Sequence, residues 1–213
     1  MSPVDDETQD DTIVLPWWRN PLNIALTALA AALVVFSAGS AFGQRDSALD
    51  HNDVDAGFMQ DMRIHHEQAV TMSIVYNGVA PTGNPLLSSI AREIVVDQST
   101  EAGRMVQLLR MFHESETNET DTAMSWMGMP TPLDKMPGMA TDAELNDLYR
   151  ARGTEAHRIF ATLMIAHHEG GVHMAEYELQ HGRNAEVRGI ARGIIASQNG
   201  EISELRSALA KLG

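Results

Sequence analysis

Apolar residues recur with helical spacing in four segments of the chain, and none of these segments alternates as a strand does. Two glycine-containing turns, Asn77-Gly78 and His181-Gly182, end the first and the third segment. Thr141 and Glu144 form a capping-box pattern where the third segment begins, and Gly153 lies inside it as a candidate break. The predicted helices are residues 54–76, 86–113, 142–180 and 184–212.

The four segments are two copies of one helical hairpin. FMQDMRIHHEQAVTM at 58–72 returns as FATLMIAHHEGGVHM at 160–174, an offset of 102. IAREIVVDQSTEAGRMVQLL from Ile90 returns as IARGIIASQNGEISELRSAL from Ile190, an offset of 100, and the turn between them absorbs the difference. A hairpin of this size rarely folds alone, so we expect the copies to pack face to face as an all-α, antiparallel four-helix bundle.

An uncharged apolar run at 21–43 precedes the repeats. It is long enough to cross a bilayer, which takes roughly 20 apolar residues, and Trp17 and Trp18 suit the membrane–water interface. We expect an uncleaved transmembrane helix; the alternative is a cleaved signal peptide, although such peptides begin with a short basic region and this chain begins with a long acidic one. The expected organisation is an acidic disordered tail at 1–20, the anchor at 21–43, a linker at 44–53 and the bundle at 54–212.

Composition narrows the possible functions. The 213 residues include no cysteine, which excludes disulfides, thiolate metal sites and cysteine nucleophiles. The formal charge of -14 argues against a nucleic-acid partner, which would call for a basic patch. Thirteen methionines and nine histidines in an acidic chain fit the handling of cations, and they also fit plain solubility.

Imidazoles and carboxylates are expected to meet inside the bundle. At 100° per residue, the paired histidines of each repeat lie on the apolar face of the first helix, and one glutamate lies on the apolar stripe of the second. An ionised carboxylate turned inward costs several kcal/mol unless it meets a charge, donors or a metal. The six residues expected to converge are His65, His66, His167, His168, Glu101 and Glu201.

Two interpretations of this cluster stay open. One is a metal centre, for which imidazole and carboxylate suit zinc, copper(II) or iron, and thioether beside imidazole suits copper(I). The other is a buried His–Glu hydrogen-bond network that sets the register of the repeats. Met62 and Met164 share the histidine face and are candidate ligands, although core packing explains them as well. The remaining histidines are expected to be mostly solvated: His51, His113, His157, His173 and His181.

The middle connection, residues 114–140, is predicted to be a loop rich in methionine. Its apolar residues do not recur with helical spacing, and it contains the sequence MSWMGMPTPLDKMPGM. Packing of a helix face therefore does not explain its methionines. They suit the capture of copper(I), or they anchor a lid, together with Trp126, over the end of the bundle. The candidate ligands here are Met127, Met129, Met136 and Met139.

The paired M-x-x-H-H-E segments, the trailing Q-x-x-E of each repeat and MPGMAT before the third helix resemble the bacterial family called domain of unknown function 305, over roughly 54–212. The resemblance implies a ferritin-like four-helix fold, export, and copper binding in some members. It points to a metal-handling role for His65, His66, His167 and His168, with the loop methionines as further candidates. The E-x-x-H pairs of ferritin-like di-iron enzymes are missing from the second and fourth helices, which disfavours a di-iron oxidase.

The leading hypothesis is a membrane-anchored extracytoplasmic protein that binds a metal, copper before zinc or iron, for sequestration or delivery. The alternative is a non-catalytic accessory subunit of a membrane complex, for example a respiratory one, in which the histidines are structural. A redox enzyme is a weaker third option. No nucleophile–base arrangement for hydrolysis is apparent, so a non-enzymatic role is favoured, while enzymatic activity stays an open question.

Overall fold

The computed structural model describes residues 16–81, 83–118 and 120–212, and for residues 41–48 it describes the backbone alone. The protein is mostly helical and separates into two units between Ser47 and Ala48. The α-helices are α1 (Pro21–Leu49), α2 (Asp53–Val79), α3 (Pro85–Phe112), α4 (Asp142–Arg150), α5 (Gly153–His181) and α6 (Ala185–Ala210).

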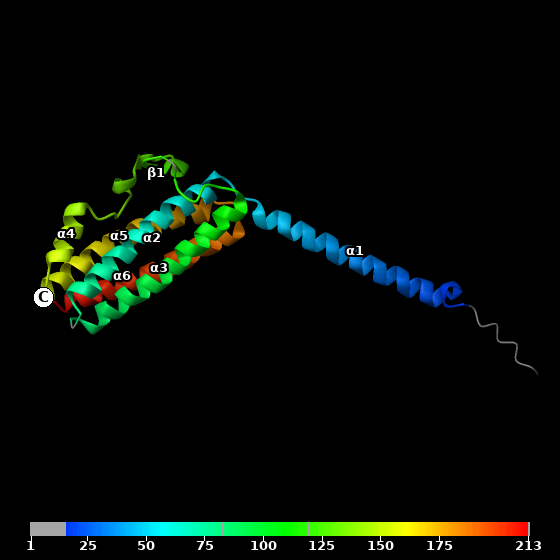
Figure 1. Ribbon diagram of the computed structural model, residues 1–213, viewed down its shortest axis with the longest axis horizontal. Coiled ribbons are helices and arrows are strands. Elements are labelled where there is room, and N and C mark those ends of the chain that lie inside the picture. The colour runs from blue at the N-terminus through cyan, green and yellow to red at the C-terminus, as the bar shows by residue number, and fades with distance from the viewer. Residues whose placement is uncertain (1–15, 82, 119, 213) are drawn as a thin grey trace, which may run out of the picture. The chain divides into compact units, whose positions relative to one another are not determined.

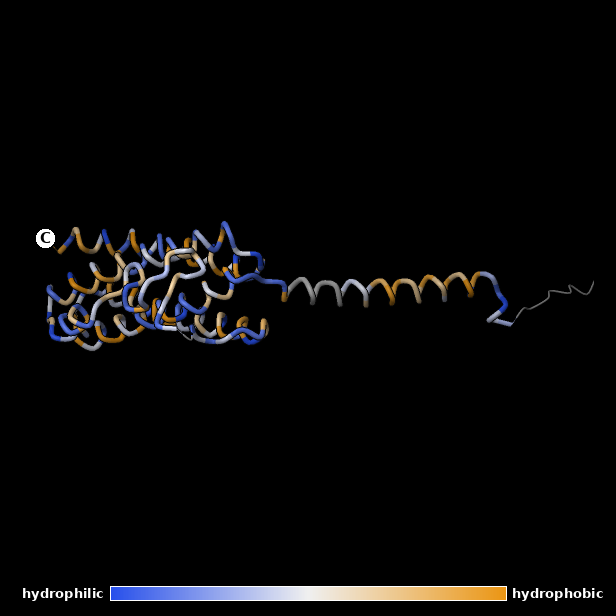
Figure 2. The backbone as a smooth tube through the Cα atoms, turned by 90° about the horizontal axis from the view of Figure 1, so that it is seen from above, coloured by the Kyte–Doolittle hydropathy of each residue, from blue (hydrophilic) through white to orange (hydrophobic). Residues whose placement is uncertain are grey.

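The N-terminal unit is dominated by α1. Its stretch Pro21–Ser40 has a mean hydropathy of 2.0 and is long and apolar enough to cross a membrane, a property that a signal sequence shares. Figure 2 shows this apolar run, whereas the other helices carry mixed polar and apolar positions. A one-turn 3₁₀ helix, Trp17–Arg19, precedes α1. The helix continues through Leu49 and so includes residues 44–49 of the predicted linker at 44–53. The predicted tail lies largely in residues 1–15, outside the described residues.

Asparagine caps begin three of the long helices. The Asn52 side chain accepts from the Asp55 amide at the start of α2, and Asp55 completes the capping box. Asn84 and Asn184 cap α3 and α6 in the same way, each accepting from two backbone amides. At its other end α2 continues past the predicted stop at Asn77-Gly78, because the Ala80 amide still donates to the carbonyl of Tyr76, at 2.9 Å.

The predicted third helix is two helices in the structure. Thr141 caps α4 in the predicted capping box with Glu144. The backbone is then extended at Ala151 and Arg152, and Gly153, the first residue of α5, takes a positive φ of 57°. A left-handed φ suits glycine and not a residue inside a helix. The candidate break at Gly153 is therefore a real boundary, and the single helix predicted over 142–180 is wrong.

In the second unit, the four long helices α2, α3, α5 and α6 pack as two hairpins. α2 lies along α3, α5 lies along α6, and the hairpins meet through α2 with α5 and α3 with α6 (Figure 1). Phe58 and Phe160, which occupy the same position in the two repeats, are both fully buried, but in different apolar clusters. The short α4 packs on α2 and α5.

The Met-rich connection is more ordered than predicted. It contains a two-stranded antiparallel ladder, β1 (Thr122–Ala123) with β2 (Thr131–Pro132), and two 3₁₀ turns, Ser125–Met127 and Leu133–Lys135. The connection lies along α2 and α5 instead of over the end of the helices (Figure 1).

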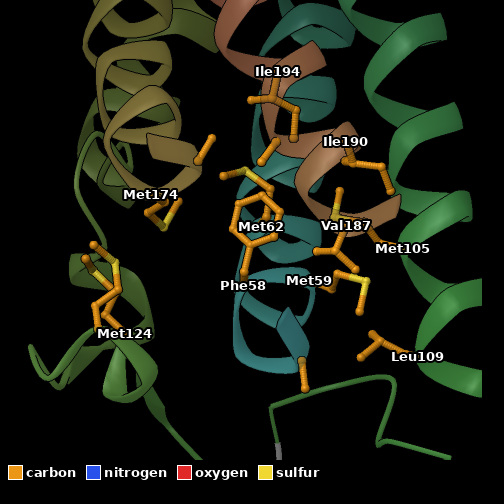
Figure 3. Packing of buried hydrophobic residues seen from close by; sticks show 14 of the residues in the cluster. Phe58, Met59, Met62, Met105, Leu109, Met124, Met174, Val187, Ile190 and Ile194 are labelled. Atoms are coloured by element: carbon orange, nitrogen blue, oxygen red, sulfur yellow. The ribbon is translucent and has the colours of Figure 1, made fainter. Parts of the chain in front are cut away.

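Trp126 and three methionines hold the connection in place. Trp126 lies edge-on against Phe58 and Tyr177, with ring centroids 5.9 and 5.6 Å apart. Its indole N–H and the Met124 amide both donate to the buried carboxylate of Asp61, at 2.8 and 2.7 Å. Met124, Met127 and Met136 are buried in the cluster that Figure 3 shows, which also contains Phe58, Met62 and Met174. These side chains anchor the connection, as one of the two interpretations of the sequence expected.

Candidate metal site

The four paired histidines are fully buried where α2 meets α5. His65 and His167 hold the same position in the two repeats, and their rings face each other, with centroids 3.7 Å apart and planes 32° apart. The neighbouring ring of His168 lies 6.2 Å from that of His167. The structure thus brings one histidine of each pair into direct contact across the interface between the repeats.

The second histidine of each pair meets the inward glutamate of its own hairpin. His66 Nε2 lies 2.9 Å from Glu101 Oε2, and His168 Nε2 lies 2.5 Å from Glu201 Oε2. Because an ionised carboxylate only accepts, Nε2 carries the proton in both rings and Nδ1 keeps its lone pair. In metal sites, a ligating histidine often donates from its other ring nitrogen to a carboxylate in the same way. That hydrogen bond orients the ring and raises the basicity of the ligating nitrogen.

His65 is oriented by a backbone group of the Met-rich connection. Its Nε2 lies 3.1 Å from the carbonyl oxygen of Pro137, which only accepts, so Nε2 carries the proton here too. Three of the four rings therefore present Nδ1 as an electron-pair donor. These Nδ1 atoms are buried and make no hydrogen bond, and neither ring nitrogen of His167 makes one.

Burial keeps the contacting pair neutral. Desolvation, assisted by the neighbouring imidazole of His66, lowers the pKa of His65 to about 3. The same desolvation, with the imidazoles of His65 and His168 nearby, places the pKa of His167 well below its ordinary value. Both rings are thus neutral at physiological pH, which is the state in which imidazole binds metals.

Two buried glutamines add polar atoms that the sequence interpretation left out. Gln98 and Gln198 lie one turn before Glu101 and Glu201, and neither amide makes a hydrogen bond. The amide of Gln198 lies over Gly171, where an added Cβ would be 2.5 Å from Oε1. Gln98 is buried on α3, whereas the neighbouring Asp97 is exposed. The recurrence of the two glutamines at the repeat offset could have identified them.

The candidate methionines do not form one group. Met62 and Met164 are fully buried in different apolar clusters. The side chains of Met127 and Met136, which belong to the connection, are buried in the cluster that contains Met62, and the partly buried Met139 packs against that cluster. Met129 is 46% exposed. His157, predicted to be solvated, is buried and pairs with the hydroxyl of Tyr76 through Nδ1, at 2.9 Å.

The unpartnered imidazole nitrogens are suitable metal ligands, but they are not arranged around one common point. Five buried imidazole nitrogens lack partners, and such groups are normally satisfied by hydrogen bonds, water or an ion. Among the described residues, however, no three His, Asp or Glu side chains are arranged to hold one ion together. The contacting rings of His65 and His167 would have to rotate apart to direct two lone pairs at a shared ion.

The fold and site define a helical protein with an apolar N-terminal helix, in which duplicated hairpins pair two buried imidazoles with partly buried carboxylates beside two contacting histidines. The chain belongs to the DUF305 family, a domain of unknown function, whose family model matches residues 55–209. The resemblance seen in the paired M-x-x-H-H-E segments is thereby confirmed.

Solved structures similar to this chain include two DUF305 proteins. One, from Streptomyces coelicolor and described as secreted, has 36% identity and a TM-score of 0.67, covering 75% of this chain and 94% of its own. A DUF305 fragment from Deinococcus radiodurans has 26% identity and a TM-score of 0.65, covering 76% and 99%.

CopM in its Cu(I)-bound form is also similar, with 26% identity and a TM-score of 0.53, covering 72% of this chain and 93% of CopM. CopM has also been solved in Cu(II)-bound, silver-bound and apo forms. No curated protein sequence matches the chain.

Proposed function

We propose that this protein is a membrane-anchored, extracytoplasmic copper-binding protein that sequesters or delivers the ion. The observation that carries the proposal is the set of buried, unpartnered imidazole nitrogens, at least two of them on rings that burial keeps neutral. Leaving such groups without partners is costly in a folded protein, and an ion would satisfy them. The likeness to CopM, which is known with Cu(I) and silver bound, favours copper over zinc or iron.

We assign the ligands from the donor chemistry. His65 and His167 hold the ion through ring nitrogens, while Glu101 and Glu201 orient His66 and His168 as further ligands. Thioether sulfur selects Cu(I) over harder ions, which gives Met62, Met164, Met127, Met129, Met136 and Met139 a role in capture. Met129 is the exposed one among them, so it is the first that an ion arriving from solvent meets.

The four long helices are proposed to form a ferritin-like antiparallel four-helix bundle of two duplicated hairpins. Short turns join α2 to α3 and α5 to α6, and the long connection joins the hairpins, as in bundles with one crossover. We place this bundle outside the cytoplasm, held by α1 as a single membrane span. The apolar length of α1 and the similar protein described as secreted support this location.

A non-catalytic accessory subunit of a membrane complex is the second candidate. The His66–Glu101 and His168–Glu201 pairs are complete hydrogen bonds without a metal, which a structural role would explain. Solubilising the native membrane gently and asking whether the protein co-purifies with a complex tests this function. Co-purification of a protein that holds no copper would favour the accessory role.

The test of copper binding uses His65→Ala combined with His167→Ala in the full chain in detergent. The matched control is His173→Ala, which removes an exposed histidine from α5. Each protein is equilibrated anaerobically with Cu(I), dialysed, and its copper per chain measured by elemental analysis. We expect wild type and control to retain copper and the double variant to lose most of it. A wild type that retains none would refute the proposal.

A further inference from the structure

A short strap lies directly over the contacting histidines. The strap is residues 136–140 of the Met-rich connection, and it lies against α2 on one side and α5 on the other. On α2, Pro137 accepts a hydrogen bond from His65, and Ala140 makes two with the side chain of Gln68, at 2.7 and 2.9 Å. The strap therefore holds one candidate ligand and is fastened one turn farther along the same helix.

Glycine allows the strap to approach α5. Gly138 has a φ of 82°, and a Cβ there would collide with the backbone of α5, lying 2.6 Å from the Cα of His167. A Cβ at Gly170 would collide with the carbonyl oxygen of Pro137. Side chains at either position would force backbone against backbone, which leaves no flexible group to move aside. Two glycines on opposite sides of the contact thus make the close approach possible.

The strap shields the site in two ways. The connection runs over the outside of α2 and α5 and covers this part of the interface between them. His65 and His167 have no exposed surface. The bond to Pro137 also occupies Nε2 of His65 and fixes its tautomer. An arriving ion therefore cannot reach the contacting rings from this side until the strap moves.

We propose that residues 136–140 are a gate that must lift from Gly170 and Gln68 before an ion can enter or leave the contacting pair, His65 and His167. This inference rests on the proposed copper binding and adds the route and rate of exchange. The anchor around Asp61, which binds Trp126 and the Met124 amide, lies outside the strap and stays closed as the strap lifts. Met129 and Met124 border a surface groove that also reaches Pro137, so thioethers line the approach.

Gly170→Ala tests the gate without altering any candidate ligand. The new methyl group displaces Pro137, while alanine favours the helix more than glycine does, so α5 is not weakened. The matched control is Gly193→Ala, a helical glycine of α6 where an added Cβ meets nothing within 4 Å. Uptake of Cu(I) from a chromophoric chelator is followed by stopped flow in the full chain. Amide hydrogen exchange of residues 136–140 is measured on the same metal-free proteins.

If the gate limits entry, Gly170→Ala takes up Cu(I) about tenfold faster than wild type, the change that ~1.4 kcal/mol of lost closed-state stability produces. Its strap amides exchange faster, and Gly193→Ala matches wild type in both measurements. Equal uptake rates despite faster amide exchange would overturn the gate and leave copper binding intact. A wild type that binds no Cu(I) would instead overturn the proposed function and the gate with it.

Gln68→Ala provides a second, independent variant should Gly170→Ala misfold. It removes both hydrogen bonds to Ala140 and frees the C-terminal end of the strap, without steric conflict. Faster uptake with unchanged copper per chain supports the gate. Unchanged uptake combined with faster exchange of the Ala140 amide refutes it.

Discussion

Glu178 is a buried acid whose ionisation should weaken the fold, and Glu178→Gln tests this. The side chain is fully buried near the turn between α5 and α6, and neither carboxyl oxygen has a hydrogen-bond donor. Its neighbour Asp55 already accepts from the amides of Asn52, Arg183 and Asn184. Burial, followed by the charge of Asp55, raises the pKa of Glu178 to about 9, and the nearby Arg188 only partly opposes this.

The sign of the effect follows from proton linkage. Because the folded state holds the proton of Glu178 up to a pKa of about 9 and the unfolded chain releases it near its ordinary value of 4.5, the folded state binds more protons between these limits. The contribution to stability is complete below pH 4.5 and is lost as the pH rises toward 9. The limiting slope is ~1.4 kcal/mol per pH unit. Relaxation and solvent screening reduce it, so we expect a loss of ~1–2 kcal/mol between about pH 5 and 8.

Glutamine imitates the protonated acid and cannot ionise. We expect Glu178→Gln to match wild type near pH 5 and to be the more stable protein near pH 8, measured by urea unfolding of the full chain in detergent with circular dichroism. Glu176→Gln, an exposed position on the same helix, should leave the pH profile unchanged. Subtracting the wild-type free energy of unfolding from that of the variant at each pH cancels the contributions of all other titrating groups. Parallel profiles for Glu178→Gln and wild type would refute a protonated Glu178.

Two further predictions concern the site and its cover. Replacing both Glu101 and Glu201 by glutamine removes the charge that orients His66 and His168, so the affinity for Cu(I) should fall about 10–100-fold in competition with a chelator. An unchanged affinity would mean that these rings do not bind the ion. Asp61→Ala leaves the indole N–H of Trp126 and the Met124 amide without an acceptor, which should cost about 1–3 kcal/mol per buried group in urea unfolding. Loss of less than this, with unchanged Trp126 fluorescence, would show that Asp61 does not anchor the connection.

Helical periodicity and caps were sufficient to predict most of the helical segments. The predicted starts of α2, α3 and α6 lie within one residue of the observed ones, where the structure places the caps Asn52, Asn84 and Asn184. The third helix was harder, because its break depends on the extended backbone at Ala151 and Arg152, which carry no strong turn preference. Periodicity also placed the paired histidines and the inward glutamates on buried faces.

The cover of the site could not be predicted from periodicity. Its contacts involve a backbone carbonyl, at Pro137, and the absence of side chains at Gly138 and Gly170. Such groups have no hydrophobic pattern, and their partners are decided by tertiary packing between residues distant in sequence, 72 positions apart for Pro137 and His65. The sequence identifies the thioethers of the connection and leaves open whether they bind copper or anchor a cover. Their packing against Phe58 and Met62 is visible only in the structure.

The duplication explains why the site is symmetric while its surroundings are not. His65 and Glu101 recur in the second repeat, and both copies are turned inward. Gln68, however, is replaced by Gly170 at the repeat offset: one fastens the strap through its amide, and the other admits it by having no side chain. One connection can therefore lie across two related helices and hold them differently. If the gate operates as proposed, ion exchange is controlled by the positions at which the repeats diverged, while binding depends on those at which they stayed alike.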